Sequence, residues 1–259
     1  MNILVLMRMV PDVVEELEIA PDGKALDLEA TRMILSESDG HALEEAILLK
    51  ERYGGRVTAV ALEAPEVDDA LYTALAKGAD RALKITGTEP GLTTYGAAQL
   101  FAGVVTATPG LMPADLILTG VQAPDDLDGL IAPLMSLRLG WPTVGIITKV
   151  DVDAAARRVT VVREYPGGLR GEFEAPLPAV LGIQAAEKPP RYVPVAKVRA
   201  VMKSQRIETA DAPVPGRAAL AEVLRMAKPE AAGQAEMIEG EPEEVAEKLC
   251  ALLAERGVL

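Results

Sequence analysis

An apolar strand, a glycine-containing turn and an apolar helix follow one another at residues 114–142, which read ADLILTGVQAPDDLDGLIAPLMSLRLGWP. The run ADLILT is typical of a buried strand, and residues 126–139 have the spacing of a helix. This order is how α/β folds present backbone N–H groups to a phosphate. The turn, however, carries Asp125, Asp126 and Asp128 and neither a basic residue nor a hydroxyl. The scaffold for a nucleotide is present without the usual phosphate ligands, and the simplest role of the aspartates is to cap the helix.

The same alternation extends to both sides of this stretch. Further strand-like runs occur at residues 3–7, 57–62, 81–85 and 143–150, and further helical patterns at residues 40–53, 65–78 and 95–105. Regular alternation of this kind predicts parallel strands with helices on both faces of the sheet. We therefore expect an α/β fold with a mostly parallel sheet.

The pattern changes after residue 150. Short β segments at 158–163 and 171–174, joined across a Pro-Gly-Gly turn, predict a hairpin that extends the sheet. Residues 188–206 contain six basic side chains and no acidic one, which predicts an extended arm that lies on a negative surface. Residues 208–216 are typical of a linker, and residues 242–256 of an amphipathic helix. We expect a nucleotide-binding-type domain at 1–186, the arm and linker at 187–216, and a C-terminal helical extension at 217–259.

Composition excludes several classes of function. The 259 residues carry a net charge of −13, which disfavours nucleic acid and anionic membrane surfaces as partners. No apolar run approaches the roughly 18–20 residues that a membrane helix requires. The single cysteine, Cys250, excludes an intrachain disulfide and a cysteine-based metal cluster. We expect a cytoplasmic protein without membrane insertion and without a metal site.

The only histidine, His41, lies close in sequence to Ser36, Ser38 and Asp39, but no G-x-S-x-G elbow accompanies it. We expect a structural histidine and no catalytic residue. Two nucleotide-dependent classes remain as alternatives. A module of the universal-stress type would carry a Gly-rich phosphate turn, and an adenylating enzyme of the pyrophosphatase-loop type would carry a Ser-Gly-Gly-x-Asp-Ser loop after the first strand. Neither pattern is in the sequence.

Several segments resemble one family and occur in its order: MNILVLMRMVPD (1–12), HALEEAILLKERYGGRVTAVAL (41–62), GVQAPDD (120–126), VREYPGGL (162–169) and MIEGEPEEVAEKLCALLAERGVL (237–259). Together they make the chain similar to the β subunit of electron transfer flavoproteins, near the nitrogen-fixation-associated and electron-bifurcating branch. The resemblance implies a Rossmann-like subunit that pairs with a larger α subunit. In that family the redox FAD lies mostly on α, β holds AMP or a second FAD, and electrons pass from flavin-dependent dehydrogenases to an acceptor. The cofactor carries the electron, so the resemblance implies a carrier subunit rather than an enzyme.

The resemblance also assigns residues. The family's nucleotide positions fall on Leu6, Ser36, Asp39, Ala61, Gly120, Gln122, Asp125, Asp128, Gly129 and Ile131. The partner-binding positions fall on the basic arm at Arg191, Tyr192, Val195, Lys197 and Arg199. In the family, polar side chains in this turn bind the phosphate. The corresponding residues of this chain, 129–132, read GLIA, so the chain departs from the family here.

Overall fold

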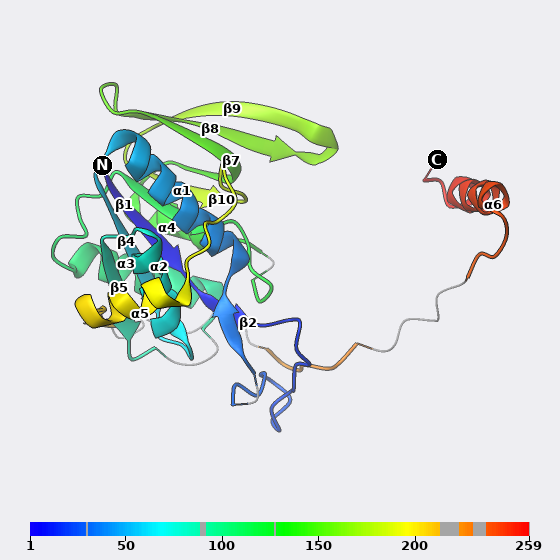
Figure 1. Cartoon of the computed structure of the whole chain (residues 1–259), viewed down its shortest axis with the longest axis horizontal. Helices are drawn as coiled ribbons and strands as arrows, with labels where there is room; N and C mark the ends of the chain where they lie inside the picture. The colour runs from blue at the N-terminus through cyan, green and yellow to red at the C-terminus, as the bar shows by residue number, and fades with distance from the viewer. Residues whose placement is uncertain (30, 89–91, 127, 213–222, 230–236, 259) are drawn as a thin grey trace. The chain divides into compact units, whose positions relative to one another are not determined.

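The computed structural model describes residues 1–29, 31–88, 92–126, 128–212, 223–229 and 237–258. The chain divides into two compact units, Met1–Arg225 and Met226–Leu259. Among the described residues, the first unit contains two sheets and five α-helices, and the second contains one helix (Figure 1). Parts of the linker and of the predicted C-terminal extension, at 213–222 and 230–236, lie outside the described residues.

A nine-stranded sheet forms the centre of the first unit, with strand order β11-β5-β4-β1-β6-β10-β7-β8-β9. Its strands are parallel from β11 to β7, and β8 and β9 are antiparallel. This confirms the predicted mostly parallel sheet. The strands are β1 (Asn2–Met7), β4 (Arg56–Leu62), β5 (Arg81–Thr86), β6 (Leu116–Gly120), β7 (Thr143–Asp153), β8 (Arg158–Tyr165), β9 (Leu169–Pro176), β10 (Ala179–Ile183) and β11 (Glu208–Asp211).

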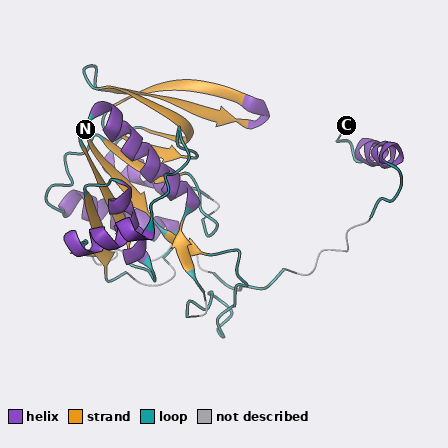
Figure 2. Ribbon diagram, viewed as in Figure 1, coloured by secondary structure: helices purple, strands orange, loops and turns teal. Residues whose placement is uncertain are grey.

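Helices cover both faces of the sheet, as Figure 2 shows. The helices of the first unit are α1 (Glu37–Tyr53), α2 (Val67–Lys77), α3 (Thr94–Ala107), α4 (Ile131–Leu139) and α5 (Val195–Ser204). Successive side chains of a strand point to opposite faces. In β1, Ile3 and Val5 accordingly join the core beneath α1 and α2, whereas Leu4 and Leu6 join the core beneath α3 and α4. Each face of the central strand is buried, which explains its uninterrupted apolar sequence.

The sheet has a topological switch point at its central strand. β1 pairs with β4 on one side and with β6 on the other, so the chain connections diverge at the carboxyl ends of β1 and β6. In open α/β sheets, ligands bind in the crevice that forms at such a point. The positions for a nucleotide must therefore be sought around Arg8 and Gly120.

The region after residue 150 confirms the predicted hairpin and corrects the conformation of the basic arm. β8 and β9 pair across a short 3-10 turn, η1 (Pro166–Gly168), and extend the sheet. The arm is irregular at 188–194, but residues 195–204 form α5 instead of an extended segment. The predicted linker is also partly regular, because Glu208–Asp211 forms β11 against β5, where Glu208 pairs with Arg81 at 2.8 Å. The domain boundaries at 187 and 217 stay predictions.

Two smaller features complete the description. β2 (Met9–Pro11) and β3 (Met33–Leu35) form a separate two-stranded antiparallel sheet between β1 and α1. The second unit holds α6 (Pro242–Glu255), which confirms the predicted amphipathic helix. Within the described ranges, each helix is too short or too polar to cross a membrane.

Candidate functional site

A small cavity lies at the switch point, at the carboxyl ends of β1 and β6. Its volume is about 10 Å³, which is room for about one water molecule. Of the predicted nucleotide positions, four line this cavity: Leu6, Asp39, Gly120 and Ile131. The lining is completed by Val121 and Asp126, which lie within the segment 120–131 that the resemblance assigns to the nucleotide, and by Arg8, Phe101 and Thr119, which the sequence interpretation did not assign to the site.

Arg8 and Asp126, which both line the cavity, form an ion pair there. Arg8 follows β1 directly, and its Nη2 lies 3.2 Å from Oδ2 of Asp126. The Asp126 side chain is only 3% exposed. A charge pair this well shielded from solvent interacts more strongly than an exposed one. The pair therefore ties the end of β1 to the turn that follows β6.

Asp39, in the first turn of α1, holds the two central strands together at the same point. Its Oδ2 accepts the backbone N–H of Arg8 at 2.8 Å, and its Oδ1 accepts the N–H of Gly120 at 2.7 Å. Burial, the largest influence, raises the pKa of Asp39 to about 6, although the Arg8 charge and these two N–H groups act in the opposite direction. The carboxylate thus uses the backbone donors at the ends of both β1 and β6.

The turn after β6 does not cap α4, which corrects the predicted role of its aspartates. α4 begins at Ile131, and its N-cap, Leu130, makes no side-chain cap bond. The turn is instead closed on itself and on α1: Asp126 bridges to Ala123, and Ser38 Oγ donates to the carbonyl oxygen of Gln122 at 2.5 Å. The acidic residues thus belong to the turn between β6 and α4, and Asp126 lines the cavity.

The remaining predicted nucleotide positions lie around the cavity without lining it. Ser36 is the buried N-cap of α1, and its Oγ lies 3.2 Å from Ser38 Oγ. Ala61 is buried in β4 in the core beneath α1 and α2. Gln122, Asp125, Asp128 and Gly129 lie in the turn between β6 and α4. That these residues bind a cofactor stays a prediction.

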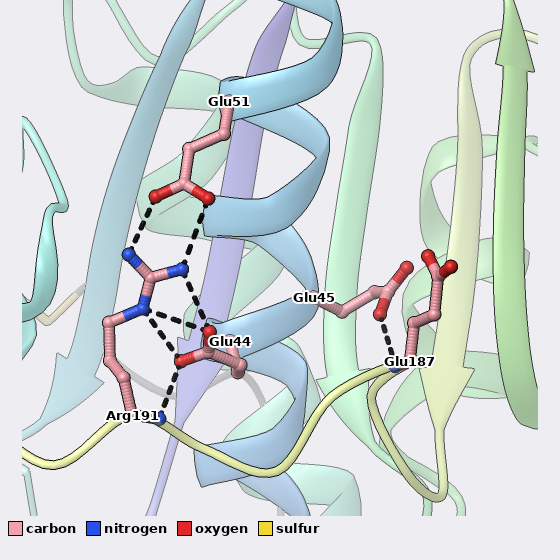
Figure 3. Close-up of polar contacts among 5 residues, drawn as sticks. All are labelled: Glu44, Glu45, Glu51, Glu187 and Arg191. Atoms are coloured by element: carbon pink, nitrogen blue, oxygen red, sulfur yellow. Dashed lines mark hydrogen bonds and ion pairs between the residues drawn. The ribbon is translucent and has the colours of Figure 1, made fainter.

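A second cluster joins α1 to the strap, which we define as residues 184–194 between β10 and α5. Arg191 lies between two glutamates one helical heptad apart, as Figure 3 shows. Its Nη1 lies 2.6 Å from Glu51 Oε1, and its Nη2 lies 2.8 Å from Glu44 Oε1. The backbone N–H of Arg191 also donates to Glu44, at 2.9 Å. The negative surface that the basic arm was predicted to meet is, for Arg191, the chain's own first helix.

Two further side chains of α1 hold the start of the strap. Glu45 Oε2 accepts the backbone N–H of Glu187 at 2.9 Å (Figure 3). The Glu187 carboxylate in turn pairs with Arg52. His41 Nδ1 accepts the N–H of Ala186 at 3.1 Å. The His41 side chain therefore has a structural contact, a hydrogen bond to the backbone of the strap.

The strap leads into α5, and the other predicted partner-binding residues are Tyr192 in the strap and Val195, Lys197 and Arg199 in α5. Tyr192 and Val195 are 84% and 61% exposed, and Lys197 and Arg199 are also exposed. α5 packs against α2, with Val201 partly buried against the core. All four residues are exposed, whereas Arg191 has a contact within the chain.

Comparison with known proteins places this arrangement in a family. The model of the electron transfer flavoprotein domain matches residues 25–215, about three quarters of the chain. The chain belongs to the electron transfer flavoprotein family. It is 32% identical to the electron transfer flavoprotein subunit beta of Clostridium acetobutylicum, over 82% of this chain and 79% of that protein. It is 29% identical to the subunit of the same name from Methylophilus methylotrophus, over 98% of each chain. It is also 30% identical to protein FixA of Azotobacter vinelandii, over 70% of this chain and 64% of that protein.

An adenine nucleotide, which the resemblance implies for the cleft, does not fit the residues as they stand. Pockets for ligands of this size are about 300–1,000 Å³, far larger than the cavity beside Arg8. The donors at the strand ends are already used by Asp39. Among the residues that the structure describes, no three His, Cys, Asp or Glu side chains gather where they could hold a metal ion.

Proposed function

We propose that this chain is the β subunit of an electron transfer flavoprotein and acts with an FAD-carrying α subunit to pass electrons between flavin-dependent dehydrogenases and an acceptor. The observation that carries the proposal is the match to a subunit beta over 98% of both chains. The family model and the protein FixA match point the same way. In this proposal the redox FAD lies mainly on α, and the pair works in the cytoplasm.

The chain's own contribution is a platform, and we assign it no bond-making step. FAD supplies the electron chemistry, and the protein around such a cofactor supplies binding, orientation and electrostatics. The side chains that would suggest hydrolysis have structural contacts: His41 accepts a strap N–H, and Ser38 donates to the turn after β6. These contacts support a carrier subunit rather than an enzyme.

The surface proposed to meet partners is the end of the strap and the start of α5. An exposed aromatic and an exposed aliphatic residue, Tyr192 and Val195, are followed in the sequence by the exposed cations Lys197 and Arg199. Apolar anchors bordered by charge are typical of protein interfaces, in which the charges govern steering and register. We propose that this surface contacts α or the dehydrogenase, and that the segments 187–216 and 217–259 serve the same contacts.

The experiment is co-purification with electron transfer as the second readout. The tagged chain is co-expressed with the α-type subunit of the same organism, and the purified material is mixed with a reduced flavin-dependent dehydrogenase. We expect a one-to-one complex whose flavin absorbance bleaches on reduction. Self-association of the chain without binding to α would contradict the proposal and favour the nucleotide-binding module of the universal-stress type.

A further inference from the structure

We infer that the ion pair between Arg8 and Asp126 closes the cleft at the switch point, and that this subunit holds no adenine nucleotide. The proposed electron-transfer function does not depend on what the cleft holds, so this inference goes beyond it. Three independent features of the cleft carry the inference: its space, its donors and its charge.

The chain's own atoms take up the space in the cleft. A Cβ added to Gly120 would stand 2.2 Å from Ser38 Oγ and 2.6 Å from Asp39 Oδ1. A Cβ added to Gly129 would stand 2.5 Å from the carbonyl oxygen of Val121. Glycines in a phosphate-binding turn let the ligand approach the backbone. Here side chains of α1 already lie against the backbone of Gly120, and the backbone of Val121 lies against Gly129.

The donors that an anion would need are engaged or missing. The N–H groups of Arg8 and Gly120 donate to Asp39. The N-terminus of α4 offers one backbone N–H fewer than usual, because Pro133 at its third position has no N–H. The Asp39 carboxylate therefore takes N–H groups at the ends of β1 and β6 that an anion in the crevice would need.

The charge around the cleft opposes a phosphate. Asp126 pairs with the guanidinium of Arg8, and the Arg8 charge also acts on the carboxylates of Asp39 and Asp125. A phosphate group would have to displace Asp126 from Arg8 and would then face the three carboxylates. Replacing Asp126 by the neutral, equally large asparagine releases Arg8 and removes one of these charges.

The test measures bound and added nucleotide with the full-length protein. The complex with α is denatured in acid, and released FAD and AMP are quantified by chromatography. AMP is also titrated calorimetrically into the complex and, in parallel, into the full chain alone, so that the result does not depend on pair formation. For the wild type we expect no AMP, at most one FAD per pair, and no binding below about 1 mM.

The variant Asp126→Asn tests the ion pair itself. We expect its AMP affinity to be at least about tenfold higher than that of the wild type, a gain of 1.4 kcal/mol. Asp69→Asn, on the exposed surface of α2, makes the same charge change and is expected to gain nothing. One AMP or a second FAD per wild-type pair would overturn the inference, even with an active carrier. A variant that binds AMP no better than the wild type would overturn the role of the ion pair, and the wild-type result stands without any variant.

Discussion

Replacing Glu45 by glutamine is expected to change how the stability of the fold depends on pH. Glu45 is 1% exposed, and its carboxylate accepts the N–H of Glu187 in the strap. Burial, the largest influence, raises the pKa of Glu45 from 4.5 to about 7. The charges of Glu187 and Asp151 also raise it, and Arg52 and the Glu187 N–H lower it.

The sign follows from proton linkage. Because the folded state binds the Glu45 proton more tightly than the unfolded state does, the free energy of unfolding falls as the pH rises from about 4.5 to about 7. At 1.36 kcal/mol for each pKa unit, the full loss is about 3 kcal/mol. Burial also raises the pKa of Asp39, to about 6, so Asp39 acts in the same direction and only a difference between variants isolates Glu45.

The assay is urea unfolding of the wild type and of Glu45→Gln at several pH values from 5 to 8. Glutamine keeps an acceptor for the Glu187 N–H and removes the titration, so the variant should gain about 2–3 kcal/mol on the wild type between pH 5 and pH 8. Glu172→Gln, on the exposed surface of β9, makes the same change of charge and should show a constant difference. Equal differences at pH 5 and pH 8 for Glu45→Gln would refute the reasoning.

Three other changes test separate parts of the structure. Arg191→Ala leaves a buried carboxylate of α1 unpaired and should lower the free energy of unfolding by about 2 kcal/mol, with Arg191→Lys intermediate because it lacks the planar fork; an unchanged urea midpoint would contradict this. Charge reversal at both Lys197 and Arg199 should weaken binding to α or to the dehydrogenase at least about tenfold in a titration, and unchanged assembly and turnover would show that these cations are not part of the contact. Gly120→Ala should destabilise the fold by about 1–3 kcal/mol through overpacking, whereas Gly40→Ala, where nothing lies within 4 Å of the added Cβ, should stabilise α1 by about 0.5–1 kcal/mol; similar thermal shifts for the two would count against the packing seen at the cleft.

The sheet was predictable because its signal is local. Residues 3–7 and 57–62 are apolar runs bounded by polar residues, and they form β1 and β4 within one residue of the expected limits. The position of β10 was not predictable in the same way. It follows β9 in sequence but lies between β6 and β7, and no local pattern encodes that order. Similarly, Glu208–Asp211 is a strand because β5 offers it a partner, not because its own residues favour one.

The cleft was only partly predictable for a related reason. Asp39 and Gly120, which the resemblance assigned to a nucleotide site, both line the cavity at the switch point. Arg8 was visible in the sequence only as a charge within an apolar run, and its role depends on Asp126, which is 118 positions away. The start of α4 was placed five residues too early, because Asp126 was interpreted as a helix cap when its carboxylate is used by Arg8.

The contact of the strap with α1 had a sequence signal that was not used. Glu44 and Glu51 are seven residues apart, as are Glu45 and Arg52, so each pair lies on one line along the helix. Two such lines of charge facing a segment with Arg191 indicate a docked strap.

Native mass spectrometry of the chain co-expressed with its α-type subunit tests most directly whether it is one half of a flavin-carrying pair. The expected spectrum shows one copy of this chain, one copy of α and one FAD, without AMP. A homo-oligomer of this chain in the presence of α would contradict the proposed function.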